Sequence, residues 1–264
     1  MVHPQSVLAP TVTLVKEVGR FIRQEGRTFD RRNIEHKGLN DLVSYVDKEA
    51  ELKLVAGLKK VLPGSGFITE EGTAAEAGTE EYTWIIDPLD GTTNFLHSLP
   101  CFAISVALLH NQTLVLGVVY EINQDECFWA TRGGGAFCNG QPIQVSPVQR
   151  LKDGLLATGF PYYDFGKMEQ YLSILNHFME HTHGLRRMGS AAVDLVYTAI
   201  GRFEGFYEYN LNAWDVAGGA LIVQEAGGQV TDFSGGNNFL FGREILASNG
   251  QVHQEMLEAI QGRW

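Results

Sequence analysis

Cysteine is scarce in this chain of 264 residues, and the three cysteines present form no recognisable pattern. Cys101, Cys127 and Cys138 are odd in number and lack Cys-x-x-Cys spacing. A disulfide framework needs paired cysteines, and the common zinc sites need closely spaced ones. The sequence therefore predicts neither, and we expect all three thiols to be reduced.

Positive charge is also in short supply. The chain has 20 Lys and Arg against 31 Asp and Glu, which gives a formal net charge of -11. Broad contact with a nucleic-acid backbone needs clustered Lys and Arg, so we expect no nucleic-acid partner. An acidic small substrate is still compatible with this charge, because bound Mg²⁺ can reverse the local sign.

Long hydrophobic runs are absent too. No uncharged stretch approaches the roughly 20 residues that a membrane-spanning helix needs, and MVHPQSVLAP has neither the cationic nor the apolar region of a secretory signal. We therefore expect a cytoplasmic protein without a membrane partner. The content of 44% hydrophobic and 19% charged residues is that of an ordinary globular protein, long enough for one large domain or two fused halves.

Three common catalytic motifs are missing. No Gly-x-Ser-x-Gly occurs, so serine hydrolase chemistry has no support. Gly166-Lys167 lacks the upstream glycine spacing of a nucleotide-binding P-loop. His177 and His181 are four residues apart, but Glu180 does not directly follow the first histidine as His-Glu-x-x-His requires. Cationic residues at a helix C-terminus explain this pair adequately.

Residues 1–150 combine helices with an antiparallel sheet. Apolar residues at helical spacing predict one helix over 11–24 and a second from near Ser44 to Pro63. Short apolar pieces follow at 66–69 and 83–86, and each ends in acidic residues. The runs FAISVALL, TLVLGVVYEI and CFWAT then predict an antiparallel meander, with Asn139-Gly140 as a further hairpin signal.

Residues 151–264 alternate strands with helices instead, so we place a soft boundary near 151. Strands are predicted in GLLATG, FEGFYEY, QVTDF and EILAS, and helices over 168–182, 191–201, 214–226 and from 252. The predicted class is α/β, with an α+β half followed by an α/β half, in layers of helices and sheets.

The stretch WIIDPLDGTTNF places two carboxylates around a proline where an apolar strand ends. Asp87 and Asp90 would repel each other unless a positive charge lay between them. Mg²⁺ prefers a few carboxylates together with water and substrate oxygens. Pro88 fixes its own φ, which predicts that the chain turns out of the strand there, lets the carboxylates converge and frees the Leu89 carbonyl as a further ligand. A solvated turn is the alternative for Asp-Pro-x-Asp-Gly.

Two other stretches also place acidic residues beside apolar ones. FITEEG ends an apolar strand in Glu70 and Glu71, which in isolation would simply face solvent. In AWDVAGGALIVQEAGG, Asp215 lies in the first turn of a helix, where the macrodipole favours it. Gly218 and Gly219 remain unexplained, since each costs roughly 0.5 to 1 kcal/mol in a helix interior. We expect close packing there that fixes the direction of Asp215.

These stretches resemble the inositol monophosphatase family. WIIDPLDGTTNF and WDVAGG match its two signatures, FITEEG lies the expected distance upstream, and GVVY, GGGAFCNGQPIQVS and EAGG extend the likeness over nearly the whole chain. The resemblance implies a Mg²⁺-dependent, lithium-sensitive phosphatase with the five-layer αβαβα sugar-phosphatase fold, usually a homodimer.

The resemblance also implies roles for the acidic residues. Glu70, Asp87 and the Leu89 carbonyl would hold one Mg²⁺, Asp87, Asp90 and Asp215 a second, and a weaker third ion would lie near Glu70, giving two or three per site. Glu70 and Thr92 would position the attacking water. The N–H groups of Gly91 and Thr92 would hold phosphate oxygens, a natural use of the start of a helical turn.

Two further residues match family positions. Asp47 matches a residue that hydrogen-bonds the water-orienting threonine, although Ser44-x-x-Asp47 is also a helix-capping pattern and both roles can hold together. Lys37 matches a lysine near the third metal, although a solvated charge is the ordinary interpretation.

For the alcohol half of the substrate, Glu208 in FYEYNLNAWD matches a glutamate that accepts hydrogen bonds from ring hydroxyls. Vicinal hydroxyls supply donors in pairs, which suits a carboxylate. An exposed strand glutamate is the alternative. Gly189, Ser190 and Ala191 match the loop beside the ring, and Asp90 and Asp215 are also expected to contact substrate.

The function predicted is hydrolysis of inositol monophosphate by metal-activated water. Related enzymes that cleave fructose 1,6-bisphosphate, histidinol phosphate or adenosine 3′,5′-bisphosphate are alternatives. A different class is a regulatory binding protein, since some bacterial relatives also associate with the transcription machinery.

Overall fold

A computed structural model describes residues 4–30, 32, 35–38, 41–75, 78–162 and 164–264 of the chain, with the backbone alone for 35–38 and 41–43. Within these residues there are seven α-helices. They are α1 (Pro4–Gly26), α2 (Tyr45–Val61), α3 (Thr92–Leu96), α4 (Met168–His181), α5 (Ala191–Ala199), α6 (Ala213–Glu225) and α7 (His253–Gln261). None of them has the length and apolar content needed to cross a membrane.

The larger sheet has seven strands and lies in the first half of the chain. In spatial order they are β3 (Gly66–Thr69), β4 (Tyr82–Asp90), β5 (Ala103–His110), β6 (Thr113–Glu121), β7 (Glu126–Thr131), β8 (Ala136–Cys138) and β9 (Gln141–Pro142). From β4 to β9 every neighbouring pair is antiparallel, which confirms the predicted meander. Only β3 pairs in parallel, with β4, and this places the acidic ends of both strands at one edge.

The smaller sheet has five strands and lies in the second half. Its spatial order is β11 (Gly184–Arg186), β10 (Leu155–Thr158), β12 (Gly205–Tyr209), β14 (Glu244–Ser248) and β13 (Gln229–Thr231). The strand β10 is parallel to both of its neighbours, whereas β14 is antiparallel to β12 and β13. A short pair, β1 (Glu35–Gly38) with β2 (Asp41–Val43), lies apart from both sheets and was not predicted from the sequence.

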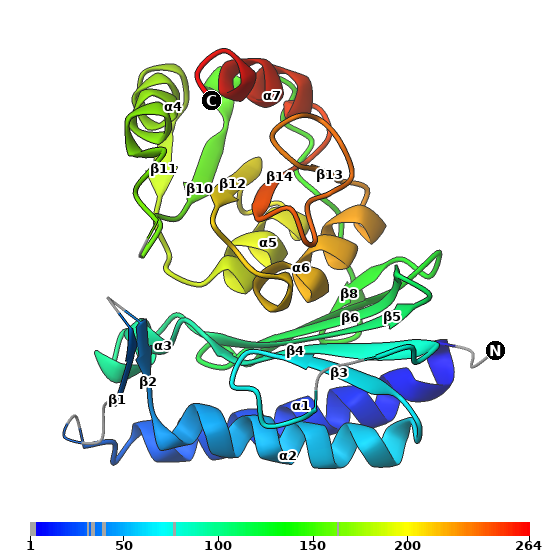
Figure 1. Cartoon of the computed structure of the whole chain (residues 1–264). Coiled ribbons are helices and arrows are strands. Elements are labelled where there is room, and N and C mark those ends of the chain that lie inside the picture. Colours follow the sequence, from blue (N-terminus) through cyan, green and yellow to red (C-terminus); the bar gives the residue numbers. More distant parts are fainter. Residues whose placement is uncertain (1–3, 31, 33–34, 39–40, 76–77, 163) are drawn as a thin grey trace.

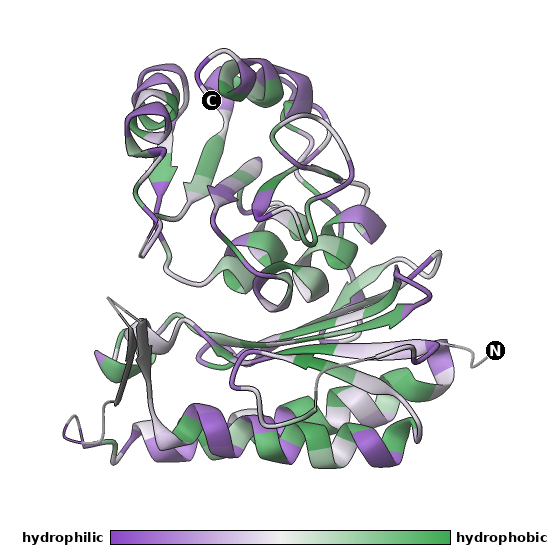
Figure 2. Ribbon diagram, in the orientation of Figure 1, coloured by the Kyte–Doolittle hydropathy of each residue, from purple (hydrophilic) through white to green (hydrophobic). Residues whose placement is uncertain are grey.

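The layers stack as helix, sheet, helix, sheet, helix (Figure 1). The pair α1 and α2 covers the outer face of the large sheet, α5 and α6 fill the space between the two sheets, and α4 with α7 covers the small sheet. This is the predicted five-layer αβαβα arrangement. In Figure 2 the central helices are largely green, because α5 and α6 are buried on nearly all sides.

Glycines set how closely the central layer packs. A Cβ at Gly117 of β6 would lie 2.5 Å from the carbonyl oxygen of Gly218, and one at Gly219 would lie 2.5 Å from the Cβ of Leu195 in α5. Real Cβ atoms do not approach other atoms so closely, so α6 is held against the large sheet and against α5 at these positions. The expected close packing around Gly218 and Gly219 is confirmed.

The first helix is longer than the prediction of 11–24. It begins at Pro4 and passes through Pro10, and its buried residues include Val7 and Leu8 before the predicted start. These two residues extend the apolar stripe, and burial on the large sheet outweighs the hydrogen bond that Pro10 cannot donate.

Candidate active site

The two acidic strand ends that sequence alone could not place as neighbours lie side by side. Parallel pairing of β3 with β4 puts Thr69 opposite Ile86, and the Glu70 N–H donates to the Ile86 carbonyl at 3.3 Å. Glu70 therefore lies next to Asp87, and burial together with the charge of Glu70 raises the pKa of Asp87.

The expected turn at Pro88 does not occur. The strand β4 continues to Asp90, and its register shifts instead, because Asp87 pairs with Ser105 and Asp90 with Ala103. One extra residue in β4 forms a bulge. Side chains three positions apart point to opposite faces of a regular strand, and the extra residue brings Asp87 and Asp90 to the same face. A bulge is also where a strand tolerates proline.

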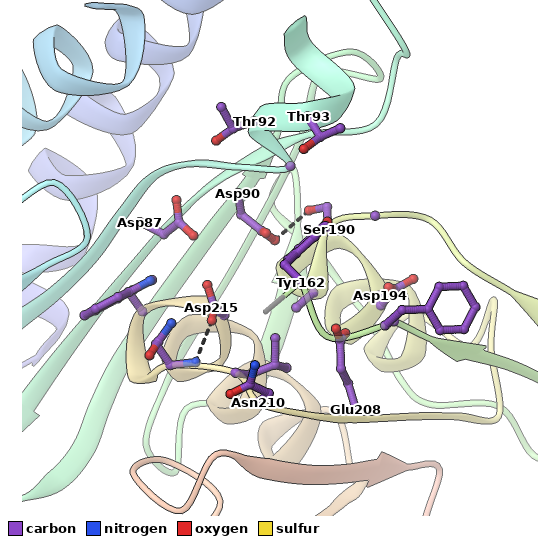
Figure 3. Close-up of a pocket in the computed structure, with 18 of the residues that line it drawn as sticks. Asp87, Asp90, Thr92, Thr93, Tyr162, Ser190, Asp194, Glu208, Asn210 and Asp215 are labelled. Carbon is purple, nitrogen blue, oxygen red and sulfur yellow. Dashed lines mark hydrogen bonds between the residues drawn. The ribbon is translucent and has the colours of Figure 1, made fainter. Parts of the chain in front are cut away.

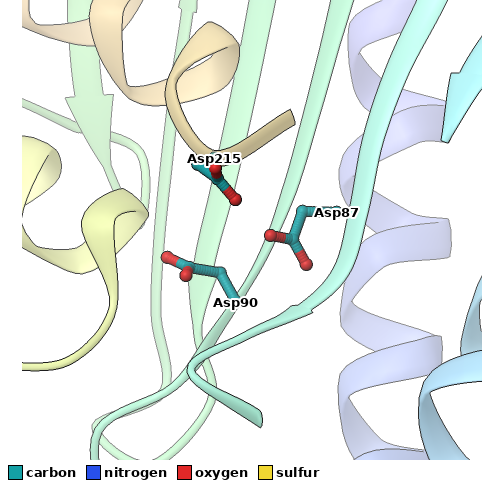
Figure 4. Close-up of side chains that lie close together, drawn as sticks. All are labelled: Asp87, Asp90 and Asp215. Carbon is teal, nitrogen blue, oxygen red and sulfur yellow. The ribbon is translucent and has the colours of Figure 1, made fainter. Parts of the chain in front are cut away.

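Asp215 reaches the same place from the central helix layer. The Asn212 N–H donates to its carboxylate at 2.6 Å in a capping box that starts α6. The Ser105 hydroxyl of β5 donates to the Trp214 carbonyl at 3.2 Å and ties this helix end to the large sheet. Oxygens of Asp87, Asp90 and Asp215 all lie within 4.8 Å of one another, and Figure 4 shows the three carboxylates converging.

The electrostatics of this cluster favour a cation. Burial, together with the charges of Glu70, Asp90 and Asp215, raises the pKa of Asp87 well above its ordinary value. Burial and the Asp90 charge raise the pKa of Asp215 to about 7. Burial raises the pKa of Asp90 to about 6 despite hydrogen bonds from Ser190 and the backbone. A divalent cation would offset this repulsion, and the all-oxygen donor set suits Mg²⁺.

Asp47 fills both of the roles considered for it. One of its oxygens accepts from the Ser44 N–H at 2.9 Å and from the Ser44 hydroxyl at 2.7 Å, which caps α2. The other accepts from the Thr92 hydroxyl at 2.9 Å. Thr92 also lies 3.0 Å from the Leu89 carbonyl oxygen. The side chain of Lys37 lies outside the described part of the structure, so its predicted role stays a prediction.

Gly91 adopts a backbone conformation in which a residue with a side chain would be strained and crowded. It caps α3 with φ of 95°, and a Cβ there would lie 3.0 Å from the Cys101 carbonyl and 3.2 Å from the Gly189 carbonyl. The helical turn expected at Gly91-Thr92-Thr93 is therefore present, and all three residues line the cavity described next.

A cavity of about 340 Å³ opens in front of the acidic cluster (Figure 3). Its lining includes most of the predicted site residues, namely Glu70, Asp87, Leu89, Asp90, Gly91, Thr92, Gly189, Ser190, Ala191, Glu208 and Asp215. Asp47 lies behind Thr92 instead. Ser190 caps α5 and donates to Asp90 at 2.6 Å, and the Ala192 N–H donates to the same carboxylate oxygen at 2.6 Å. The loop before α5 thus fixes Asp90 as well as the cavity wall.

Glu208 is not the exposed strand glutamate of the alternative interpretation. It is only 7% exposed and belongs to β12 of the small sheet. Its carboxylate lies against Gly159, where an added Cβ would come within about 2 Å of the carboxylate atoms. Gly159 therefore leaves the space that Glu208 occupies.

Several cavity residues escaped the sequence analysis. Asp194, Gly159, Phe160, Tyr162 and Arg187 line the end near Glu208. The Arg187 guanidinium donates to the Tyr162 hydroxyl at 2.8 Å and lies over the rings of Phe160 and Tyr162. One signal was available: Asp194 follows Ser190 by four residues, which puts both on one face of a helix.

Comparison with known proteins agrees with this geometry. Residues 3–263 of the chain match the family described as "Inositol monophosphatase family". A putative Nus factor SuhB of Neisseria meningitidis is 44% identical over 93% of this chain and 94% of its own length. An inositol-1-monophosphatase of Mesorhizobium japonicum is 39% identical over 97% and 96%. The crystal structure of the extragenic suppressor protein suhB of Bartonella henselae superposes with a TM-score of 0.91 at 40% identity, covering 97% and 98%. The chain therefore belongs to the inositol monophosphatase family and is a phosphatase.

Proposed function

We propose that the protein hydrolyses inositol monophosphate to inositol and phosphate in one in-line step that depends on Mg²⁺. The observation that carries this proposal is the convergence of Asp87, Asp90 and Asp215 at one end of a cavity whose other end holds Glu208. One end is suited to metal and phosphate, and the other to an alcohol with several hydroxyls.

The acidic end has the donors for two or three Mg²⁺ ions. Glu70, Asp87 and the Leu89 carbonyl would hold one ion, Asp87, Asp90 and Asp215 a second, with a weaker third near Glu70. When bound, such ions supply a water of lowered pKa and neutralise charge on the phosphoryl group. The raised pKa values of the acids in the absence of a cation support this assignment.

Thr92 and Glu70 would orient the attacking water. Because the Thr92 hydroxyl donates its proton to Asp47, its oxygen lone pairs face other donors and can accept from that water. A carboxylate oxygen of Glu70 can accept the water's second hydrogen. The N–H groups of Gly91 and Thr92 would hold phosphate oxygens. The water oxygen would then bond to phosphorus while Glu70 takes one of the water's protons, and the ester bond would break on the opposite side. The departing alcohol oxygen would take a proton from solvent, to which Glu70 returns its own.

The alcohol would lie between Glu208 and the Gly189–Ala191 loop. Glu208, Asp90 and Asp215 supply acceptors for its hydroxyl groups, and the small side chains of the loop leave room for a ring. Other small phosphate esters compete for this role, namely fructose 1,6-bisphosphate, histidinol phosphate and adenosine 3′,5′-bisphosphate.

Phosphate release from this panel tests the proposal. Inositol 1-phosphate should give the highest kcat/KM, chelation should abolish release and Mg²⁺ should restore it, and lithium should inhibit. Asp87→Asn should lower kcat at least about 1000-fold, because a shared metal ligand is lost. A higher kcat/KM for another panel member would make that compound the proposed substrate. Full activity in the presence of chelator would refute the dependence on Mg²⁺.

A regulatory role is a second candidate, and the names of several relatives favour it. Proteins called Nus factor SuhB, at 40% to 44% identity, cover nearly the same length as this chain. The net charge of -11 favours protein contacts over nucleic-acid contacts for such a role. If both wild type and Asp87→Asn capture transcription proteins in a pulldown, binding is independent of catalysis. If neither protein captures any, the regulatory role is refuted.

The remaining properties implied for the family complete the proposal: a homodimer in the cytoplasm. Light scattering at micromolar concentration should give a mass near 58 kDa, about twice the 29.2 kDa of one chain. A mass of one chain would contradict the dimer without touching the proposed chemistry.

A further inference from the structure

Asp194 is a buried acid at the alcohol end of the cavity, and nothing in the proposed reaction uses it. It lies in the first turn of α5, is 1% exposed and lines the cavity wall. Among the described residues, its Oδ1 atom has no hydrogen-bond partner. A buried polar oxygen without a donor is costly, so its retention calls for a donor that arrives from elsewhere.

The surroundings of Asp194 show what kind of donor fits. Figure 3 places Asp194 and Glu208 at the end of the pocket away from Asp87. Burial and then the charge of Glu208 raise the pKa of Asp194, whereas the charge of Arg187 lowers the pKa of both acids. A negatively charged group on a ligand would be repelled by these two acids. Neutral hydroxyl groups would supply hydrogen-bond donors to both carboxyl groups without adding charge.

We propose that Asp194 is a specificity-determining residue that accepts a hydrogen bond from a second hydroxyl group of the leaving alcohol. This hydroxyl is adjacent to the one that donates to Glu208. The pair then selects neutral polyols with a run of adjacent hydroxyls over alcohols that lack them. This inference rests on the proposed phosphatase function. An ester without those hydroxyls leaves the buried acid unpaired, which is the arrangement that gives enzymes their strongest discrimination.

The test compares Asp194→Leu and Asp194→Asn with wild type on inositol 1-phosphate and on phenyl phosphate, whose alcohol has no further hydroxyl. Asp194→Leu should raise KM for inositol 1-phosphate by about 10- to 100-fold with little change in kcat, because a contact made in the ground state is lost. Its kcat/KM for phenyl phosphate should be unchanged or higher. Asp194→Asn keeps one acceptor oxygen and should give a smaller effect in the same direction.

Inositol phosphates that lack one hydroxyl each sharpen this test. For the analogue missing the hydroxyl that Asp194 reads, Asp194→Leu should cause no further loss, since the two deletions remove one interaction. Thr198→Val is the matched control. Thr198 is buried on the same helix, donates to the Asp194 carbonyl at 2.9 Å and does not line the cavity, so its kinetics should match wild type.

Three outcomes for Asp194→Leu would overturn the inference. They are an equal loss of kcat/KM for both esters, an unchanged KM for inositol 1-phosphate, and a loss of kcat/KM that adds to the loss from the missing hydroxyl in every deoxy analogue. If Asp194→Leu does not fold, as judged by thermal unfolding, the ratio of kcat/KM for inositol 1-phosphate to kcat/KM for phenyl phosphate in Asp194→Asn decides. Wild-type protein that hydrolyses neither ester would instead refute the proposed phosphatase function, and the inference with it.

Discussion

At the scale of single residues, Asp47 shows how one carboxylate can join folding to chemistry. Its two oxygens have different partners, since one caps α2 through Ser44 and the other accepts the Thr92 hydroxyl. The cap fixes the carboxylate, and the carboxylate in turn fixes which way the Thr92 proton points. A residue whose local pattern indicates only a capping box can therefore also position a group in the active site.

Substitution of Thr92 tests that connection. Thr92→Val keeps the shape but removes the hydroxyl, so the attacking water loses an acceptor, and kcat should fall by about 100-fold. Thr92→Ser is the matched control, because it keeps the hydroxyl, and its kcat should stay within about threefold of wild type. Steady-state phosphate release measures both. Similar kcat values for the two variants would show that the hydroxyl has no part in the reaction.

The residues of the metal end were predictable from sequence, and those of the alcohol end only partly. Asp87 and Asp90 end an apolar strand and Asp215 begins a glycine-containing helix, but a solvated turn and a helix start suit these patterns too. The grouping of the three acids was predicted from the family resemblance. Asp194 lies in an apolar helix, and its one signal in the sequence is its spacing of four residues from Ser190. Its position near Glu208 follows from the packing of α5 against the small sheet.

At the scale of elements, the bulge in β4 replaces the turn that Pro88 indicates. The sequence shows a residue that cannot donate to a ladder, but it does not show whether the chain leaves the sheet or accommodates one extra residue. Pairing of β5 with β4 on both sides of the bulge decides for the second. The predicted convergence of Asp87 and Asp90 is right, although the predicted cause is wrong.

The contact of α6 with the large sheet gives the element-scale prediction. Gly117→Ala would place a Cβ 2.5 Å from the Gly218 carbonyl oxygen, and backbone cannot rotate away as a side chain can. We expect a loss of about 3 kcal/mol in the free energy of unfolding, at the upper end of overpacking costs. Activity should fall as well, because a displaced α6 moves Asp215.

Chemical unfolding measures the loss of stability, and phosphate release at a series of Mg²⁺ concentrations measures the loss of activity. Gly78→Ala is the control, since Gly78 is exposed and its Cβ would lie 3.6 Å from the nearest atom, an ordinary contact. Its stability should change by less than about 0.5 kcal/mol. If Gly117→Ala is as stable and as active as Gly78→Ala, the close approach of α6 does not position the site.

At the scale of the whole molecule, the cavity exists only where both halves of the chain meet. The acids of β4 belong to the large sheet, Asp215 to the helix layer between the sheets, and Glu208 to the small sheet. The two sheets lie on either side of residue 151 in the chain, and the division into halves at residues 1–150 and 151–264 stays a prediction. Sequence periodicity indicated the elements of each half, whereas the order of the five layers came from the family resemblance.

Because the acids of the site are crowded together, their protonation should be coupled to the stability of the entire fold. Burial raises the pKa of Asp90 from 3.8 to about 6, and burial together with the charge of Asp90 raises that of Asp215 from 3.8 to about 7. The folded protein thus holds protons that the unfolded chain has released, and stability without metal falls as pH rises from about 4 to 7. For Asp215 alone the shift corresponds to a destabilisation on the order of 4 kcal/mol.

Magnesium should reverse this trend, since it binds the ionised acids of the folded state only. The increase in unfolding temperature on adding Mg²⁺ should therefore be small at pH 5 and largest near pH 8. Subtracting the chelated curve from the Mg²⁺ curve removes other titrating groups, such as His253, whose pKa burial lowers to about 4. Asp215→Asn should reduce the increase at pH 8 several-fold. An increase that is equal at pH 5 and pH 8 would mean that the crowded acids are not what the metal binds.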